Sequence, residues 1–171
     1  MKHLILVDFD GTVVTHEFPK IGKDIGAAPV LRELVAAGHQ LILWTMRCDH
    51  TEPPTSNDPD IHPGNYLSEA VKWFEDRNIP LYGINTNPTQ HTWTTSRKAY
   101  GTLCIDDINL GARLSKIAHL RPFIDWKKTY EDLCEMKLIP WNDATLYSVE
   151  AERLAMLKSY MLCAMVKRHL K

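Results

Sequence analysis

The sequence predicts an α/β fold in which a parallel β-sheet carries helices on both faces, a three-layer Rossmann-like arrangement. Four short apolar segments with strand character alternate with amphipathic segments or long connections, the pattern that parallel sheets require. The 171 residues are 44% hydrophobic and 24% charged, which is typical of one globular domain with a substantial core. We therefore expect a single sheet with helices packed along it.

The predicted strands are apolar runs of four or five residues that end at polar residues. They are HLILV at 3–7, QLILW at 40–44, LYGIN at 81–85 and TLCI at 102–105. Continuous apolar runs of this length fit interior strands that are buried on both faces.

The predicted helices show apolar residues at helical spacing. They cover residues 28–38, 65–77, 125–136 and 146–169. Pro29 suits a first helical turn and Gly38 a helix end, while Ser148 is a candidate N-cap for the last helix. Residues 48–64 are rich in Pro, Asp and Ser, so we expect a loop there.

Net charge and the N-terminal sequence bear on which partners and which cellular location we expect. The formal net charge is −1, which gives no electrostatic reason to expect a nucleic-acid or membrane partner. The apolar run Leu4 to Val7 stops at Asp8, so the N-terminus lacks the layout of a signal peptide. We therefore expect a cytoplasmic protein.

Polar residues follow every predicted strand at its carboxyl end. Asp8 and Asp10 follow the first strand, and Thr45 and Arg47 the second. The third strand ends in Asn85-Thr86-Asn87, and Asp106 with Asp107 follows the fourth. The carboxyl ends of parallel strands meet at one edge of the sheet, where ligands bind. We expect these side chains to converge on one site.

Converging carboxylates repel one another unless a cation compensates them. Mg²⁺ binds a few oxygen ligands, water and phosphate oxygens, so it suits Asp8, Asp10, Asp106 and Asp107. Lys98 stands eight residues before Asp106, where a helix could begin and run back toward the same edge. The set of side chains predicts a site for a metal-bound anionic group such as phosphate.

These residues resemble, in order, the signature motifs of the haloacid dehalogenase-like (HAD) superfamily. The run Asp8-Phe9-Asp10-Gly11-Thr12-Val13 resembles the first motif and Thr45 the second. Lys98 resembles the third motif and Asp106-Asp107 the fourth. The longer runs FPKIGKDIGAAPVLRELVAAGHQLILWTMR and SRKAYGTLCIDDINLGA resemble a short, capless branch of HAD hydrolases and phosphatases.

The resemblance also sets expectations for domain organisation. It covers residues 1–134 as a HAD-like catalytic domain, and residues 135–171 form a C-terminal helical extension packed on the same domain. Positions 11–44 hold only a flap, a helix and a strand, so no large cap domain fits between the first two motifs. The stretch between the second and third motifs holds one helix, one strand and polar loops, so no cap domain fits there either.

The resemblance implies an Mg²⁺-dependent phosphatase that hydrolyses phosphate monoesters through an aspartyl-phosphate. Asp8 would be the nucleophile and a metal ligand, and Asp10 the general acid and base, with its backbone carbonyl on the metal. Asp106 and Asp107 would bind the metal. Thr45 and Lys98 would contact the phosphoryl group, and Lys98 would also offset charge on Asp8.

The residues that follow Asp10 are candidates for substrate binding. Gly11 would let backbone amides approach the phosphate, and Thr12 belongs to the same turn. Arg47 could contact substrate or pair with an acid. His16 lies in the flap, where it could touch substrate or remain a solvated loop residue.

Several alternatives stay open at this point. The inner metal ligand could be Asp106 or Asp107, and Arg97 could serve in place of Lys98. Residues 48–64 and the segment NPTQHTWTTS at 87–96 are candidate specificity elements. The stripe Met156, Met161 and Met165 indicates helix core or a homodimer seam on the C-terminal helix.

The natural substrate is a phosphorylated compound that the sequence does not identify. A nucleotidase or polynucleotide phosphatase is the nearest enzymatic alternative, although the weak net charge makes long nucleic acid unlikely. A non-catalytic binding protein on a HAD-like scaffold is the alternative from another class.

Overall fold

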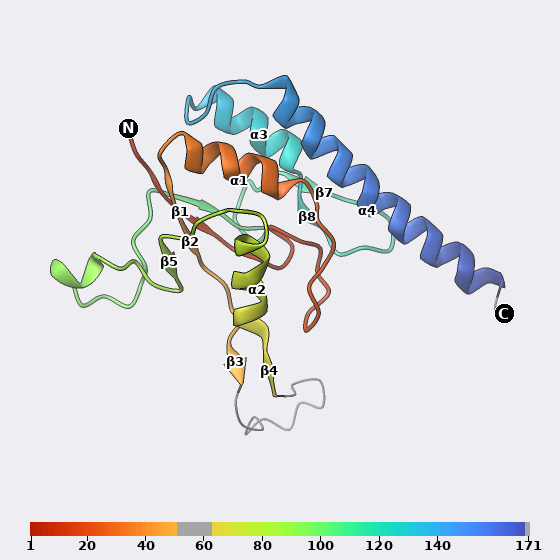
Figure 1. The fold of residues 1–171 in the computed structure, drawn as a ribbon, viewed down its shortest axis with the longest axis horizontal. Coiled ribbons are helices and arrows are strands. Elements are labelled where there is room, and N and C mark those ends of the chain that lie inside the picture. The colour runs from red at the N-terminus through yellow and green to blue at the C-terminus, as the bar shows by residue number, and fades with distance from the viewer. Residues whose placement is uncertain (51–62, 170–171) are drawn as a thin grey trace.

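A four-stranded parallel sheet forms the centre of the molecule (Figure 1). The structure is a computed structural model that describes residues 1–50 and 63–169. Its strands are β1 (Leu4–Val7), β2 (Gln40–Leu43), β5 (Gly83–Ile84) and β6 (Leu103–Ile105). The order across the sheet is β5-β2-β1-β6. The α/β class and the parallel sheet of the prediction are confirmed.

The interior strand β1 sets the register. Leu6 is level with Ile42 of β2 and with Cys104 of β6. Ile5 and Val7 point into the core and are fully buried. Phe9 continues that inward side beyond the strand and is buried too, so Asp8, between Val7 and Phe9, is directed to the rim.

Helices flank the sheet. They are α1 (Ala27–Ala36), α2 (Tyr66–Glu75), α3 (Trp126–Glu135) and α4 (Asp143–His169). Pro29 lies in the first turn of α1, and Gly38 follows its end with a φ of +87°, a conformation that favours glycine. Asp125 caps α3 by accepting a hydrogen bond from the Lys128 amide. All four predicted helices are present, with small shifts at their ends.

The last helix begins earlier than predicted. α4 starts at Asp143, and the Asn142 side chain accepts a hydrogen bond from the Ala144 amide at 3.0 Å. Ser148 is therefore inside the helix, where its hydroxyl donates to the Ala144 carbonyl at 2.9 Å. The predicted N-cap at Ser148 is wrong because Asn142 already satisfies the first turn.

The connection from β5 to β6 differs from the prediction. It contains only the 3-10 helix η1 (Gln90–Thr92), and no helix begins at Lys98. The Gln90 side chain donates to the carbonyls of Ser96 and Lys98, at 2.9 and 2.8 Å. These bonds hold the segment in an irregular path, which a helix starting at Lys98 could not follow.

Two short hairpins stand apart from the main sheet. The antiparallel pair β3 (Asp49–His50) and β4 (Gly64–Asn65) closes the segment predicted as a loop over 48–64. Residues 51–62 of that segment lie outside the described residues. The second hairpin pairs β7 (Leu114–Ser115) with β8 (Phe123–Ile124).

The C-terminal helices pack against the first helix. α4 runs along α1 and α3 in Figure 1, and its C-terminal end extends past the remainder of the described chain. Thr145 of α4 donates to Glu33 of α1 at 2.6 Å, and Lys127 of α3 pairs with Glu150 of α4 at 3.1 Å. In the part of the chain that the structure describes, we find no helix with the length and apolar character of a membrane span.

Candidate active site

An open cavity of about 540 Å³ lies at the carboxyl ends of the parallel strands. Residues from β1, β2, β5 and β6 ends meet there, together with the flap after β1 and the β7–β8 connection. Its lining comprises Asp8, Asp10, His16, Trp44, Thr45, Met46, Asn85, Asp106, Asp107, Ile108 and Arg121. The predicted convergence of strand ends is therefore present.

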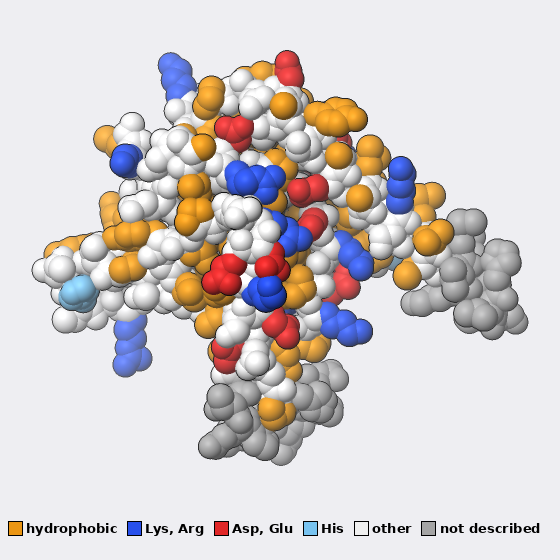
Figure 2. Space-filling view, viewed as in Figure 1, with side chains coloured by type: hydrophobic (Ala, Val, Ile, Leu, Met, Phe, Trp, Pro, Cys, Tyr) orange, Lys and Arg blue, Asp and Glu red, His pale blue; other side chains and the backbone are white. Residues whose placement is uncertain are grey.

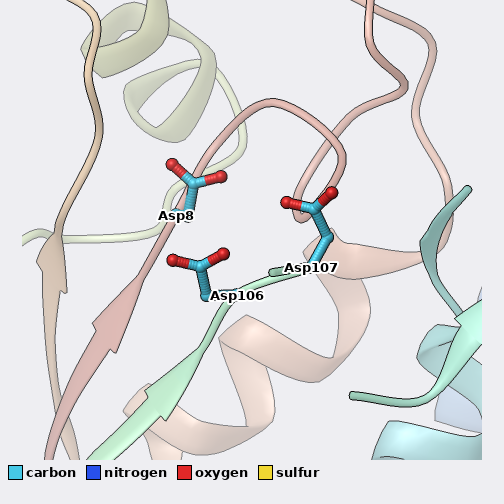
Figure 3. Close-up of side chains that lie close together, drawn as sticks. All are labelled: Asp8, Asp106 and Asp107. Carbon is cyan, nitrogen blue, oxygen red and sulfur yellow. The ribbon is translucent and has the colours of Figure 1, made fainter. Parts of the chain in front are cut away.

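Three carboxylates lie together in this cavity. Asp8 follows β1, and Asp106 and Asp107 follow β6, so the side chains project from two adjacent strand ends (Figure 3). One oxygen of each lies within 4.8 Å of the others. All three residues are half-buried. Asp10 does not join this cluster with its side chain.

Burial and mutual repulsion act on the protonation of Asp8. Burial is the main cause that raises the pKa of Asp8 from 3.8 to about 7. The charges of Asp106, Asp107 and Asp10 act in the same direction, and a hydrogen bond from the Phe9 backbone opposes them. Near neutral pH, Asp8 is therefore divided between its protonated and ionised forms. A cation among the three carboxylates would favour the ionised form.

Thr12 connects Asp8, which follows β1, with Asp107, which follows β6. Its hydroxyl donates to Oδ2 of Asp8 at 3.3 Å and accepts from the Asp107 amide at 3.1 Å. Thr12 is fully buried, so it fixes the distance between these acids without facing the cavity. The sequence prediction places Thr12 among the substrate-binding residues; the contacts indicate a positioning residue.

Gly11 is required by backbone geometry. Its φ is +81°, and a Cβ there would lie 2.1 Å from Nε2 of His16. Its amide donates to the Val14 carbonyl at 2.8 Å, so this N–H closes a turn. The approach of backbone amides to a phosphate at this turn stays a prediction, and it would use an N–H group other than that of Gly11. Close packing of the flap explains the glycine instead.

His16 brings the flap onto the acidic cluster. Nε2 of His16 lies 3.1 Å from Oδ2 of Asp107 and 3.1 Å from the Pro122 carbonyl. Both partners accept, so Nε2 carries the hydrogen. Arg121, next to Pro122, also lines the cavity. The β7–β8 connection therefore supplies a basic group that sequence reasoning missed, because nothing in the local pattern around Arg121 marks it.

Arg47 is paired with Asp10 inside the protein. Nε and Nη2 of Arg47 donate to the two carboxylate oxygens of Asp10, each at 2.7 Å. The remaining donors reach the carbonyls of Pro19 and Lys20, at 3.2 and 2.8 Å. Arg47 is almost completely buried. Of the two sequence alternatives, substrate contact or an acid partner, the structure shows the acid partner.

Thr45 lies at the rim with its backbone fixed by Asn85. The Thr45 amide donates to Oδ1 of Asn85 at 2.8 Å, and the Arg47 amide donates to the Thr45 hydroxyl at 3.3 Å. Asn85 also lines the cavity. The sequence pattern includes the polar residues at the end of the third strand, Asn85 among them. Spacing alone does not predict that Asn85 contacts the Thr45 amide.

Lys98 and Arg97 are exposed, and neither is among the described residues that line this cavity. Arg97 lines a separate cavity beside η1. Of the predicted specificity segments, Trp93 is exposed and packs on Tyr100 instead of entering the cavity. The predicted role of Lys98 is therefore not supported by its position.

Residues after β6 support the loop that carries Asp8 and Asp10. The Ile124 amide donates to the Gly11 carbonyl at 2.8 Å, and the buried Trp126 indole donates to the Thr12 carbonyl at 2.6 Å. Tyr160 of α4 donates to Glu17 of the flap at 2.6 Å. Sequence analysis assigned Trp126 only to a helix, because a contact over this separation leaves no local pattern.

The carboxylate cluster fits a hard divalent cation. Asp8, Asp106 and Asp107 offer oxygen ligands at one point. Among the described residues, the ion pair found for this cluster is that of His16 with Asp107. Oxygen ligands with uncompensated charge are what Mg²⁺ and Ca²⁺ bind. Asp10 is predicted to bind the metal through its backbone carbonyl, and its side chain is held by Arg47.

Comparison with known proteins identifies a structural relative. No family model and no curated protein matches the sequence. A solved structure described as a conserved protein coded by a locus of Bacteroides thetaiotaomicron is similar, with 31% sequence identity and a TM-score of 0.59. The similarity covers 86% of this chain and 98% of that one. At this identity and coverage, the chain belongs to the same family as that conserved Bacteroides protein.

Proposed function

We propose that this protein is an Mg²⁺-dependent phosphohydrolase of the HAD-like type, acting on phosphate monoesters through an aspartyl-phosphate on Asp8. The observation that carries the proposal is the cluster of Asp8, Asp106 and Asp107 in an open cavity at the strand ends. The motif order of the sequence is consistent with the same chemistry. The capless form and a cytoplasmic location belong to this proposal.

The proposed reaction has two displacement steps at phosphorus. An oxygen of ionised Asp8 attacks phosphorus, the bond from phosphorus to the ester oxygen breaks, and Asp10 donates a proton to that leaving oxygen. Asp10, now ionised, then takes a proton from water, whose oxygen attacks phosphorus, and the bond from phosphorus to Asp8 breaks. Inorganic phosphate leaves, and both aspartates return to their starting states.

Asp10 must move to perform this role. Both of its carboxylate oxygens are engaged by Arg47, so one must be released and take up a proton before Asp10 can protonate a leaving oxygen. Asp10 already lines the cavity and keeps 20% side-chain exposure, so a rotation toward substrate is open to it. Arg47 would hold Asp10 in place between turnovers.

Asp8, Asp106 and Asp107 would hold Mg²⁺. When bound, Mg²⁺ neutralises negative charge on the phosphoryl group and keeps Asp8 ionised. Thr12 preserves the spacing of Asp8 and Asp107 through its hydroxyl. With Mg²⁺ offsetting both negative charges, the carboxylate of Asp8 could approach an anionic phosphoryl group.

Arg121 is the better-placed cation for the phosphoryl group. It lines the cavity, whereas the resemblance assigns this role to Lys98, which does not. Arg47 uses its donors within the protein, so it has little left to offer a substrate. Thr45 at the rim remains a hydrogen-bond donor for a phosphoryl oxygen.

The rim of the cavity indicates the kind of ester that would fit. Trp44, Met46 and Ile108 line it, and Met46 and Ile108 are strongly exposed at 96% and 76%. An apolar leaving group could cover these side chains while phosphate meets the carboxylates. An aryl phosphate is therefore a suitable first substrate.

The test is hydrolysis of an aryl phosphate with Mg²⁺ and with chelator. We expect Mg²⁺-dependent turnover that falls at least about 1,000-fold in Asp8→Asn. Asp76→Asn, at the exposed aspartate that follows α2, is the matched control and should keep full activity. Turnover that persists in chelator or in Asp8→Asn would refute the proposal. A folded wild type inactive on a broad panel of phosphate esters would favour a binding protein.

A further inference from the structure

The last helix is apolar on two opposite faces. Val149 and Met156 of α4 are buried, at 0% and 2% exposure, against the rest of the chain. On the other side, Tyr147, Leu154 and Met161 are 78%, 53% and 66% exposed. Figure 2 shows hydrophobic side chains along the described part of the surface that α4 occupies. Single exposed apolar residues are ordinary, but a continuous row is not.

The exposed row follows the repeat of a coiled coil. Tyr147, Ala151, Leu154, Lys158 and Met161 are separated by four, three, four and three residues, and all five are exposed. We call this row the α4 seam. A 3.5-residue repeat keeps the same face of one helix against a partner helix. A helix that only covered its own domain would need no second repeat on its outer face.

We propose that the α4 seam binds the α4 seam of a second copy, forming an antiparallel helix pair about a two-fold axis. An isologous interface requires a self-complementary surface. In an antiparallel pair, Leu154 packs against the partner's Ala151, so a large residue meets a small one at the centre. The same register sets Lys158 opposite the partner's Tyr147.

Charge complementarity favours this antiparallel orientation. Lys158 lies within about one helical turn of the partner's Glu150 in this register. Within its own chain, Glu150 also contacts Lys127 at 3.1 Å and Arg153 at 3.7 Å. A parallel pair would instead bring the two Lys158 ammonium groups together in the seam. The seam therefore complements itself in the antiparallel orientation.

The position of α4 leaves the seam accessible. The seam residues lie on the side of α4 opposite to Val149 and Met156, which are buried against the rest of the chain. The inner face of the helix is tied down by Thr145 on Glu33 and by Tyr160 on Glu17, at 2.6 Å each. The seam thus projects on a fixed helix, which reduces the entropy lost on association.

Sedimentation velocity of the full-length chain tests the proposal. We expect the wild type to be a dimer at micromolar concentration, and Leu154→Glu to weaken dimerisation at least about 100-fold. Leu110→Glu is the matched control, because Leu110 is fully exposed at 106% on another surface and its change should leave the dimer intact. A monomeric wild type, or a dimer unaffected by Leu154→Glu, would overturn the proposal.

Charge reversal tests the orientation. Lys158→Glu should weaken the dimer, and Glu150→Lys combined with Lys158→Glu should restore it at least in part, because the attraction is reversed on both sides. Circular dichroism of each variant checks that the helix is intact. A double variant no better than Lys158→Glu alone would refute the antiparallel register. None of these outcomes depends on phosphatase activity.

Discussion

Arg47 holds both carboxylate oxygens of Asp10, at 2.7 Å each, although the two residues lie 37 positions apart. Arg47 has 1% of its side chain exposed and Asp10 has 20%. The ion pair therefore joins a buried cation from the end of β2 to an acid at the cavity wall. It couples the position of the proposed proton donor to the loop after β2.

Arg47 substitution should reduce both stability and activity. Arg47→Met leaves the Asp10 carboxylate without its partner, and we expect a loss of about 3 kcal/mol in the free energy of unfolding. Arg47→Lys keeps the charge but loses the bidentate geometry, so it should lose less. Urea unfolding measures both variants. If both variants unfold like the wild type and only the substrate KM rises, Arg47 contacts substrate instead.

The pKa of Asp8 predicts how stability depends on pH without metal. Its pKa is about 7 in the folded chain and 3.8 as an ordinary carboxyl, so between these values the folded state binds more protons than the unfolded state. Stability from this group therefore decreases as pH rises from about 4 to about 7. Asp8→Asn removes this dependence. Thermal unfolding in chelator should show a shallower loss for Asp8→Asn; equal slopes would contradict the assignment.

Magnesium should stabilise the folded chain, and more strongly at pH 8 than at pH 5.5. Mg²⁺ competes with the proton on Asp8 and binds the carboxylate cluster only in the folded state. At 100 times its dissociation constant, a ligand contributes about 2.7 kcal/mol. Differential scanning calorimetry with Mg²⁺ and with chelator measures the shift. Asp106→Asn should abolish it and Asp76→Asn should not; an unchanged shift in Asp106→Asn would place the metal elsewhere.

Arg121 and Lys98 offer a direct comparison between structure and motif. Arg121→Gln removes the cation that lines the cavity, so we expect kcat/KM for an aryl phosphate to fall roughly 10- to 1,000-fold. Lys98→Gln should change it less than about twofold. Steady-state kinetics of both variants shows which of the two substitutions lowers kcat/KM more. The opposite ranking would restore the role that the sequence motif assigns to Lys98.

The fold was predictable where signals are local. Apolar runs gave the strands, and the acids after β1 and β6 converge because parallel strands end at one edge. The failures concern contacts between distant segments. The helix predicted to begin at Lys98 is absent because Gln90 holds this segment in an irregular path. Arg121 and the Trp126 contact with Thr12 could not be found from sequence, since neither has a characteristic spacing.

The most direct test of the central claim is to trap the phosphorylated protein. Mixing the wild type with an aryl phosphate and Mg²⁺, quenching in acid and sequencing the peptides by mass spectrometry should locate a phosphoryl group on Asp8. Asp10→Asn, in which the second step is slowed, should accumulate more of it. Hydrolysis that proceeds without phosphorylation of Asp8, or with the phosphoryl group on another residue, would contradict the proposed mechanism.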